Sequence, residues 1–489
     1  MIKSRSTKGY FLIQTLVFGM IAVLVIGGLV SFAGANIRLG RRSIQSEQAF
    51  ENAESGLEYY RWHLAHAPTD YTDGTGNPGP ITKNITNASG TVIGTFTLVI
   101  TQPPVGSTLV TIESTGKVTA DPTVKRTILS KLAVPSFANF AAVTDNDITF
   151  GQGTEVFGPI HSNGGIRFDG LAHNLVTSAI SKYDDPDHND SGTDKKEFGV
   201  HTHVNPPPGT GLNNAYRPAE VPPAAVQARS DVFMAGRSFP APTVDFGRIT
   251  TDLDQMKIDA ETDGLYFASS SAYGYRIVLK TDNTFDLYTV TALVAPPYSC
   301  TNTGNQSGWG TWSVETSTFI DNYTVPENGL VFLEDHVWVE GQIDHTRITI
   351  VAAKLPDNSS TRKSITINND VRYTNYDGTD VIALIAQDDV NVGMVSGNVL
   401  RIDAALVAQN GRVGRYYYES DCYPYYTRNS ITLYGTIVTA QRYGFAYSGS
   451  ASTGYEIRNI IYDAYLLYSP PPSFPKIDSY HEVIFWKEI

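Results

Sequence analysis

The sequence predicts an α+β protein that is mainly β, with a long N-terminal helix, a small antiparallel sheet and a large parallel β-helix-like solenoid with insertions. Three observations support this prediction. An apolar run near the N-terminus continues into a helical stripe, and β-branched segments alternate with turns rich in Gly and Pro. Further on, apolar residues recur every 17 or 18 positions.

The composition excludes several classes of protein. Charged residues make up only 17% of the chain, and Gly (42), Tyr (28) and Pro (26) are plentiful, which excludes a disordered acidic protein and a coiled coil. A net charge of −13 argues against direct nucleic-acid binding, because phosphate contacts need clustered Lys and Arg. The two cysteines are too few for a zinc ribbon.

The N-terminus contains an apolar segment long enough to cross a membrane. Residues 1–9 form a short basic leader, and residues 10–35 are almost wholly apolar, with Gln14 as the main polar interruption. At about 1.5 Å per residue this segment spans the roughly 30 Å hydrocarbon core of a bilayer. A secretory signal cut near Ala33-Gly34-Ala35 is the alternative, although apolar regions of such signals are usually about 7–15 residues long.

The next segment, residues 36–67, has the pattern of an amphipathic helix. Apolar residues recur at alternating steps of three and four, which places them on one stripe, and Pro68 ends the pattern. The predicted packing stripe consists of Phe50, Ala53, Leu57, Tyr60 and Leu64. We therefore expect one helix over residues 10–67, apolar all round in its first part and amphipathic in its second.

A basic leader ending in Gly, followed by such a helix, resembles the N-terminus of type IV pilins and pseudopilins. The run QAFENAESGLE, from Gln48 to Glu58, is similar to a stretch of PilX-type minor pilins. In that family a prepilin peptidase cuts after the Gly and the new N-terminal residue is methylated. The resemblance implies cleavage between Gly9 and Tyr10, a membrane-anchored precursor, and later incorporation into a filament.

One position departs from the pattern of major pilins. Their fifth mature residue is Glu, which neutralises the N-terminal ammonium of a neighbouring subunit in the apolar filament core, whereas the matching residue here is Gln14. Gln14 can form hydrogen bonds but cannot neutralise a charge. Minor pseudopilins at a filament tip share this lack, so the resemblance favours a tip position. The alternative is a tolerated polar residue in an ordinary membrane anchor.

Residues 68–136 predict a small β-domain. Residues 69–89 are rich in Thr, Gly, Asn and Pro and are predicted to be a loop. Three β-branched runs follow, at 92–100, 109–114 and 123–134. We expect an antiparallel sheet packed on the amphipathic half of the helix, as in pilin heads.

Residues 137–475 show the periodicity of a parallel β-helix. Ile148 and Phe150 recur eighteen positions later as Ile166 and Phe168. A second series, spaced by 17 or 18 residues, consists of Ile350, Ile367, Ile385 and Ile402. A turn of this kind cannot bury its inner face alone, so several must stack.

Insertions and a tail complete the predicted layout. The insertions are placed at 183–243, 245–328 and 409–430, and residues 476–489 are predicted to be a C-terminal tail. A short helix is expected over Val244–Asp259 and a hairpin over Arg276–Val290. The region also resembles an uncharacterised β-helical domain that follows PilX-type N-termini and has no assigned catalytic residues.

The two cysteines and the aromatic-rich insertions are the next candidate sites. Cys300 and Cys422 are predicted to form a disulfide, because the body of an anchored protein outside the membrane lies in an oxidising compartment; two unrelated thiols are the alternative. Tyr and Trp suit binding surfaces. The candidate binding residues are Trp309, Trp312, Tyr416, Tyr417, Tyr418, Tyr423, Tyr425 and Tyr426. Alternatively, these side chains cover the open flank or end of the solenoid.

One acidic loop has the composition of a calcium site. Counting from Asp185, residues Asp187 and Asn189 occupy the third and fifth positions of a calcium-binding loop. However, Asp190 replaces the required Gly and Lys196 replaces the required Glu. A solvated acidic loop is therefore favoured, and no cofactor is expected, with calcium as the weak exception.

Other chemistry receives little support from the sequence. His201 and His203 would share one strand face, but two ligands do not close a zinc site, so they are interpreted as ordinary polar residues. No GxSxG, P-loop or HExxH motif occurs. Acidic residues of the kind used by β-helical lyases and hydrolases are scattered. We therefore expect no enzymatic activity.

Together these features predict a minor pilin-like subunit of a type IV pilus-like filament. It would lie in the bacterial cytoplasmic membrane before assembly and at the cell surface afterwards. A head this large belongs at or near the tip, where it would act in assembly initiation, adhesion or surface contact. The expected partners are other pilins, prepilin peptidase, the inner-membrane assembly machinery and an unknown surface ligand. The alternatives are a membrane-anchored β-helical carbohydrate-active enzyme and a secretion-system pseudopilin.

Overall fold

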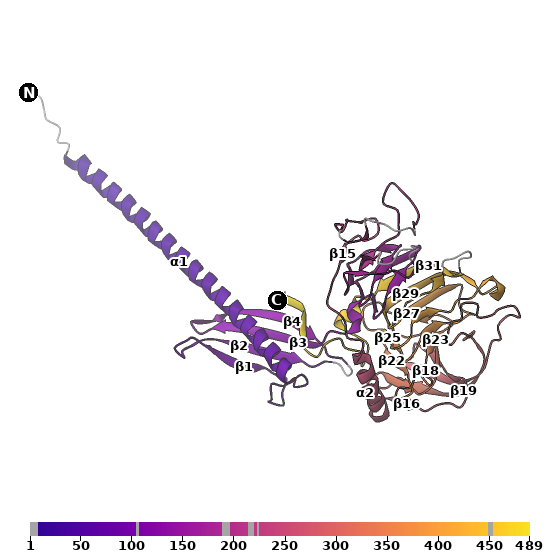
Figure 1. Ribbon diagram of the computed structural model, residues 1–489. Coiled ribbons are helices and arrows are strands. Elements are labelled where there is room, and N and C mark those ends of the chain that lie inside the picture. The colour runs from indigo at the N-terminus through magenta and orange to yellow at the C-terminus, as the bar shows by residue number, and fades with distance from the viewer. Residues whose placement is uncertain (1–7, 104–106, 188–195, 214–219, 223, 448–452) are drawn as a thin grey trace, which may run out of the picture. The chain divides into compact units, whose positions relative to one another are not determined.

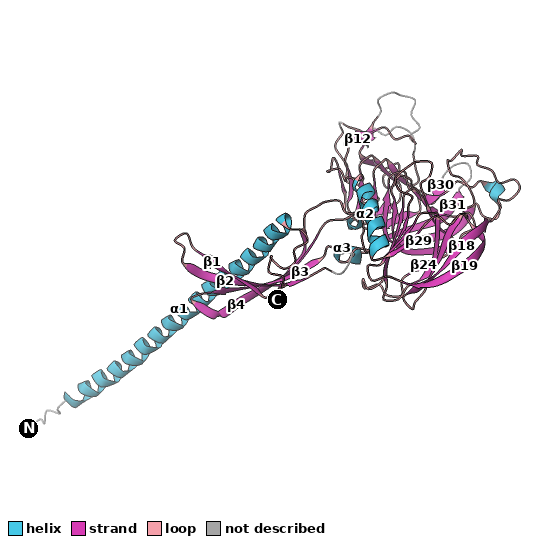
Figure 2. Ribbon diagram, turned by 90° about the horizontal axis from the view of Figure 1, so that it is seen from below, coloured by secondary structure: helices cyan, strands magenta, loops and turns pink. Residues whose placement is uncertain are grey.

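A computed structural model describes residues 8–103, 107–187, 196–213, 220–222, 224–447 and 453–489 (Figure 1). The chain divides into two compact units. The first consists of Met1–Gln102, Val110–Leu132 and Val483–Ile489, and the second of Pro103–Leu109 and Ala133–Glu482. Strands dominate and helices are few (Figure 2). The predicted fold class is confirmed: a long N-terminal helix, a small antiparallel sheet and a large parallel sheet.

The first unit contains helix α1, Lys8–His66, which ends just before Pro68. The last turns of α1 lie along the small sheet, as Figure 1 shows. The side chains of Ala53, Tyr60 and Leu64 are completely buried there. Leu57, Tyr60 and Leu64 share a core with Phe96, Leu98, Ile100, Val110, Ile112 and Leu132 from the strands. The amphipathic stripe is therefore the surface by which α1 packs on the sheet.

The sheet of the first unit has five strands in the order β1-β2-β3-β4-β32. They are β1 Ile81–Thr86, β2 Val92–Thr101, β3 Val110–Val118, β4 Asp121–Ala133 and β32 Glu482–Glu488. The pairs β1–β2, β2–β3 and β3–β4 are antiparallel. Two of these strands fall where none was predicted. β1 lies within the predicted loop 69–89, and β32 lies within the predicted tail 476–489.

Helix α1 and strand β3 approach each other closely enough to require glycine. A Cβ atom built on Gly116 would lie 2.0 Å from the carbonyl oxygen of Ala49. Two hydrogen bonds fasten the same contact: Asn52 Nδ2 donates to the carbonyl oxygen of Lys117 at 2.7 Å, and Ser114 Oγ donates to that of Ala53 at 2.7 Å. The register of the helix on the sheet is thus fixed by polar contacts as well as by apolar packing.

The second unit is built from parallel ladders. The longest runs through β16 Leu265–Phe267, β20 Leu330–Leu333, β22 Arg347–Ala352, β25 Val381–Ala386, β27 Val399–Ala408, β29 Thr427–Thr439, β5 Ala142–Thr144, β8 Ile160–Ser162, β11 Val176–Ser178 and β15 Arg237–Ser238. Each strand in this list is parallel to the next. This stacking makes the second unit a β-helix-like solenoid.

Further parallel ladders form the other sides of the solenoid. One runs through β17 Gly274–Leu279, β21 Val337–Gln342, β23 Ile365–Ile367, β26 Val390–Val392 and β28 Val413–Arg415. Another links β24 Val371–Arg372 through β27 and β29 to β31 Thr453–Tyr462, β7 Thr154–Phe157 and β10 Leu171–Ala172. A short third ladder joins β6 Ile148–Phe150, β9 Ile166–Phe168 and β14 Val200–His201.

The remaining elements are antiparallel additions and helices. They are the pair β12 Lys182–Tyr183 and β13 Glu197–Phe198, the strands β18 Thr284–Leu293 and β19 Val314–Thr324 beside β17, and β30 Ala446–Tyr447 beside β31. The helices with described bounds are α2 Arg248–Thr262, α3 Tyr465–Tyr468 and the 3₁₀ turns Phe137–Asn139 and Ser420–Cys422. Helix α2 buries Ile249, Leu253, Met256 and Ala260.

The order of the solenoid does not follow the order of the sequence. Strands β29 and β31, near the C-terminal end of the second unit, pair with β5 and β7, near its beginning. Ile437 lies opposite Ala142, and Ile460 lies opposite Val156. Residues 142–178 therefore stack on the last turns of the chain, and not ahead of the turns that begin at β16.

The eighteen-residue repeat of the first turns is confirmed, and the isoleucine series is wrong. Ile148 and Phe150 lie directly opposite Ile166 and Phe168. In contrast, Ile350 lies opposite Leu384, and Ile402 lies opposite Val371 and Leu433. Each turn in that part of the solenoid contains more than one strand, so isoleucines 17 or 18 residues apart fall on different sides of it.

Two predicted insertions contribute to the solenoid itself. Residues 183–243 include β14 and β15, which extend two of the parallel ladders. Residues 245–328 include β16 and β17, which pair with β20 and β21 at the other end of the stack. Short strands interrupted by Pro-rich segments gave no periodic signal from which the sequence could place them.

The Cys300–Cys422 disulfide is present and buried. It joins positions 122 residues apart and lies in a small core with Met394, Tyr416 and Tyr418. The first cysteine lies between β18 and β19, and the second in the 3₁₀ turn that follows β28. The bond therefore fastens one excursion of the solenoid to another.

Replacing Gly116 by Ala is expected to destabilise the first unit by about 1–3 kcal/mol, because the added methyl group meets the helix backbone. Hydrogen exchange of the amides in β3 and in the last turns of α1, measured on detergent-solubilised protein, checks this. Gly40→Ala is the control, since a Cβ there meets nothing within 4 Å. Equal protection in the two variants would contradict the proposed helix–sheet contact.

Removing the disulfide through the double substitution Cys300→Ser and Cys422→Ser is expected to lower the stability of the second unit by about 2–5 kcal/mol. Thermal unfolding with and without a reductant measures the effect. The reductant should lower the midpoint of the wild type and leave that of the double variant unchanged. A reductant effect of equal size in both proteins would show that the bond is not responsible.

Candidate functional site

The N-terminal part of α1 presents a continuous apolar surface that no other described residues cover. No Asp, Glu, Lys or Arg occurs between Tyr10 and Ile37. Phe11, Phe18 and Leu24 are 76%, 69% and 71% exposed. By length and composition this helix is able to cross a membrane. A helix that is apolar all round is stable only in lipid or among other apolar helices.

The positions matched to pilin processing lie at the start of this helix. Gly9 and Tyr10 belong to its first turn, and the side chain of Tyr10 is 73% exposed. Gln14 is exposed on the next turn, and its neighbour Thr15 donates a hydrogen bond to the carbonyl oxygen of Phe11 at 2.8 Å. Inside lipid or a helix bundle, the amide of Gln14 would require a hydrogen-bonding partner. Leader residues 1–7 lie outside the described part of the chain.

Most of the predicted aromatic binding residues are packed and not displayed. Tyr416 and Tyr418 belong to the core around the disulfide, and Trp309, Trp312, Tyr425 and Tyr426 pack against it. Tyr418 Oη donates to the carbonyl oxygen of Gly310 at 2.7 Å. Tyr417 is half-buried, and Tyr423 is 74% exposed. The packing favours the interpretation that these side chains cover the solenoid, with Tyr423 as the displayed exception.

Acidic residues of the solenoid mostly have structural partners. Asp403 is fully buried, and it accepts hydrogen bonds from Arg401 Nε at 2.6 Å and Tyr376 Oη at 2.7 Å. Asp389 accepts from the backbone N–H of Arg412 at 2.8 Å. Burial, and then the negative charge of Asp389, raise the pKa of Asp388 to about 6. Asp388 and Asp389 lie in the turn before β26, whereas Asp403 lies within β27.

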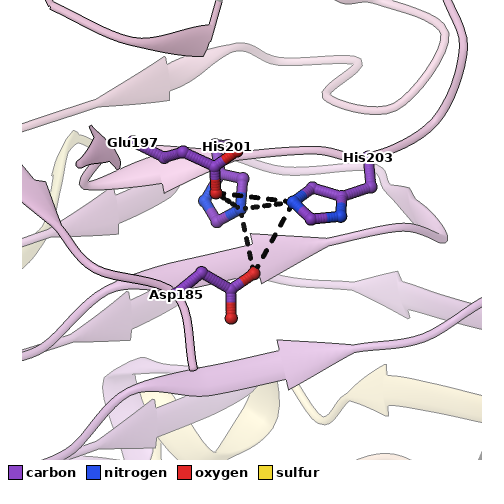
Figure 3. Close-up of side chains that lie close together, drawn as sticks. All are labelled: Asp185, Glu197, His201 and His203. Carbon is purple, nitrogen blue, oxygen red and sulfur yellow. Dashed lines mark hydrogen bonds and ion pairs between the residues drawn. The ribbon is translucent and has the colours of Figure 1, made fainter. Parts of the chain in front are cut away.

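The described residues also contain a buried cluster that includes His201 and His203 together with Asp185 and Glu197 (Figure 3). Their side chains are at most 1% exposed. Asp185 follows β12, Glu197 begins β13, His201 ends β14, and His203 lies two residues further on. The pairing of Tyr183 with Glu197 and of His201 with Arg167 fixes the backbone positions.

The polar atoms of the cluster converge on one point. His201 Nε2 lies 3.2 Å from His203 Nε2, 3.3 Å from Asp185 Oδ2 and 2.6 Å from Glu197 Oε2. His203 Nε2 lies 3.6 Å from Asp185 Oδ2 and 3.4 Å from Glu197 Oε2. Figure 3 shows the two imidazole rings and the two carboxylates facing one another.

In the cluster, the attraction between the histidines and the carboxylates outweighs the effect of burial on the pKa of His201. Burial alone opposes an imidazolium, but hydrogen bonds and charge from Asp185 and Glu197 prevail and raise the pKa of His201 to about 9. Burial likewise opposes the carboxylates, yet contacts with His201 hold the pKa of Asp185 and of Glu197 below the usual range. The guanidinium of Arg167 lies 3.7 Å from Asp185 Oδ2 and adds positive charge.

Patterns in the sequence indicate the members of this cluster only separately. They place Asp185 in the candidate calcium loop and favour ordinary polar roles for the two histidines. Asp187, its expected partner in that loop, instead forms an ion pair with Arg442 and donates only its backbone N–H to Asp185. Asn189 lies outside the described residues. Glu197, four residues before His201, was the missing signal.

Comparisons with known proteins leave the family of this chain open. No protein-family model matches the sequence, and no curated protein does. Among solved structures, the competence-associated pilin ComZ from Thermus thermophilus is similar over 91% of this chain and 98% of its own, with 13% sequence identity and a TM-score of 0.30. A TM-score this low does not establish a shared fold, so the case for function rests on the residues of the chain itself.

Proposed function

We propose that this chain is a minor pilin-like structural subunit of a type IV pilus-like filament. The observation that carries the proposal is the charge-free, largely exposed apolar part of α1, which continues without a break into a part that packs on a small antiparallel sheet. The first part needs an apolar environment, and the second holds it rigidly to a folded unit. A filament-forming helix requires both an apolar part that packs on other helices and a part that is attached firmly to a folded unit.

The two apolar environments available to such a helix correspond to two stages of one pathway. Before assembly, the helix lies in the cytoplasmic membrane, where its length exceeds the roughly 30 Å hydrocarbon core. In the filament, helices of other pilins replace the lipid. Because lipid and helix surfaces are equally apolar, the exchange does not require exposing the segment to water. Cleavage between Gly9 and Tyr10 would remove the basic leader that otherwise retains the N-terminus at the membrane surface.

Gln14 supports a position at or near the filament tip. A subunit within the filament must neutralise the ammonium group of a neighbour. Leaving that charge unpaired in the apolar core would cost on the order of several kcal/mol of desolvation free energy. Gln14 offers hydrogen bonds but no charge. A tip subunit has no such neighbour ahead of it, so this requirement does not arise there.

The second unit would then act at the exposed end of the filament in assembly initiation, adhesion or surface contact. Its parallel ladders and its disulfide suit a rigid extracellular module, and Tyr423 presents an aromatic ring to solvent. We propose that it has no enzymatic role, because carboxylates such as Asp389 and Asp403 form structural hydrogen bonds within the solenoid.

Processing provides the first test. When co-expressed with an active prepilin peptidase, the chain should begin at methylated Tyr10, as read by intact mass and N-terminal peptide analysis. Gly9→Val should keep residues 1–9 and fail to enter sheared filaments, because the branched side chain blocks the scissile bond. Gly151→Ala, where an added Cβ meets nothing within 4 Å, is the control and should be processed normally. An intact N-terminus beside a fully processed reference prepilin, or cleavage near Ala35, would overturn the proposal.

Filament position provides the second test. Gold-labelled antibodies against the second unit should mark filament ends and not their length. Substitution Gln14→Glu, which restores a carboxylate able to pair with a neighbouring ammonium, should allow labelling along the shaft. Uniform labelling of wild-type filaments would contradict the tip position while leaving the pilin-like role intact.

A further inference from the structure

The buried cluster of Asp185, Glu197, His201 and His203 brings two carboxylates and two imidazoles together, and Asp185 Oδ2 has no hydrogen-bond partner among the described residues. Three atoms surround His201 Nε2: His203 Nε2 at 3.2 Å, Asp185 Oδ2 at 3.3 Å and Glu197 Oε2 at 2.6 Å. An imidazole nitrogen carries at most one hydrogen. That hydrogen can serve the short contact with Glu197, but it cannot also bridge the other two. A cation at the centre of the four atoms can contact all of them at once.

The spacing of these atoms matches a tetrahedral metal centre. Zinc lies about 2.0–2.1 Å from nitrogen and oxygen ligands, so neighbouring ligand atoms of a tetrahedron are about 3.3–3.4 Å apart. Four of the five separations that involve a histidine Nε2 atom lie between 3.2 and 3.6 Å, and all four ligand atoms lie within 4.8 Å of one another. The 2.6 Å contact of His201 with Glu197 is a hydrogen-bond distance, and it would lengthen when a metal replaces the proton between them.

The donor types select the class of metal. Two imidazole nitrogens and two carboxylate oxygens suit Zn²⁺ and neighbouring transition metals, whereas Ca²⁺ and Mg²⁺ prefer sites made wholly of oxygen. A divalent cation would also balance the two carboxylates in a place from which water is excluded, where unpaired charge is costly. The side chains are at most 1% exposed, so a bound metal would have no open path for a substrate among the described residues.

The surrounding chain holds the ligands in place. Asp169 Oδ1 accepts the backbone N–H of His203 at 2.8 Å, and Asp169 Oδ2 accepts from Arg167 Nε at 2.7 Å. Arg167 lies in β9, opposite His201 in β14. The ligands therefore come from three short segments that are held by one ladder of the solenoid and by the β12–β13 pair.

From this geometry we propose that Asp185, Glu197, His201 and His203 bind one structural Zn²⁺ ion. The ion would fasten the excursion that carries Asp185 and Glu197 to the end of the solenoid near β14. It is a role in stability and not in catalysis, and it is independent of the proposed filament function.

The test uses the full-length, untagged chain in detergent. After treatment with a chelator and dialysis against Zn²⁺, the wild type should hold about one zinc per chain by elemental mass spectrometry. The bound zinc should raise the midpoint of thermal unfolding by about 5 °C or more. Co²⁺ in place of Zn²⁺ should give the intense visible absorption of a tetrahedral site.

Matched variants identify the ligands. His201→Gln with His203→Gln should reduce bound zinc to below about a tenth of an equivalent and abolish the thermal shift. His345→Gln, which alters a histidine whose side chain is 72% exposed, should bind as the wild type does. Should the double variant fail to fold, the Zn²⁺ and Co²⁺ measurements on the wild type still decide. No zinc uptake by the wild type, an octahedral Co²⁺ spectrum, or equal zinc in the folded double variant would overturn the site.

Discussion

The absence of charge between Tyr10 and Ile37 is the constraint on which the rest of the molecule depends. A helix of this length with exposed apolar side chains on every face cannot remain in water. It needs lipid or other helices, and the chain itself provides neither in the described residues. The remainder of α1 satisfies its own packing needs on the small sheet through Leu57, Tyr60 and Leu64. One helix therefore combines a part whose apolar side chains are buried by the chain's own sheet with a part whose apolar side chains need lipid or partner helices to cover them.

The second unit obeys a different rule, in which each turn is stable only because its neighbours cover it. Side chains such as Ile148, Ile350 and Leu384 are completely or almost completely buried within the stack. Excursions from the turns then need separate fastening, because they lack the support of the ladders. The disulfide serves the excursions that carry Cys300 and Cys422. A metal at His201 and His203 would serve the segment that contains Asp185 in the same manner.

Local patterns in the sequence predict the helix, three of the five strands of the small sheet and the opposed pairs Ile148–Ile166 and Phe150–Phe168, since each depends on spacing along the chain. Contacts between distant segments could not be predicted from these local patterns. Nothing near β29 indicates that Ile437 lies opposite Ala142, and nothing in the final residues indicates that they join the sheet of β4. The sequence did not predict the histidine cluster for the same reason. Asp185 is separated from His201 by a segment without periodicity, and only folding brings the two together.

The placement of β32 has a mechanical consequence. The chain leaves the small sheet at the end of β4, builds nearly all of the second unit, and returns to pair with β4 as β32. Any pull on residues 133–482 is thus transmitted through two covalent connections that end on adjacent, hydrogen-bonded strands. Tension is divided between them, and separating the edge strand requires breaking its ladder with β4. A tether of this kind resists traction better than a single linker does.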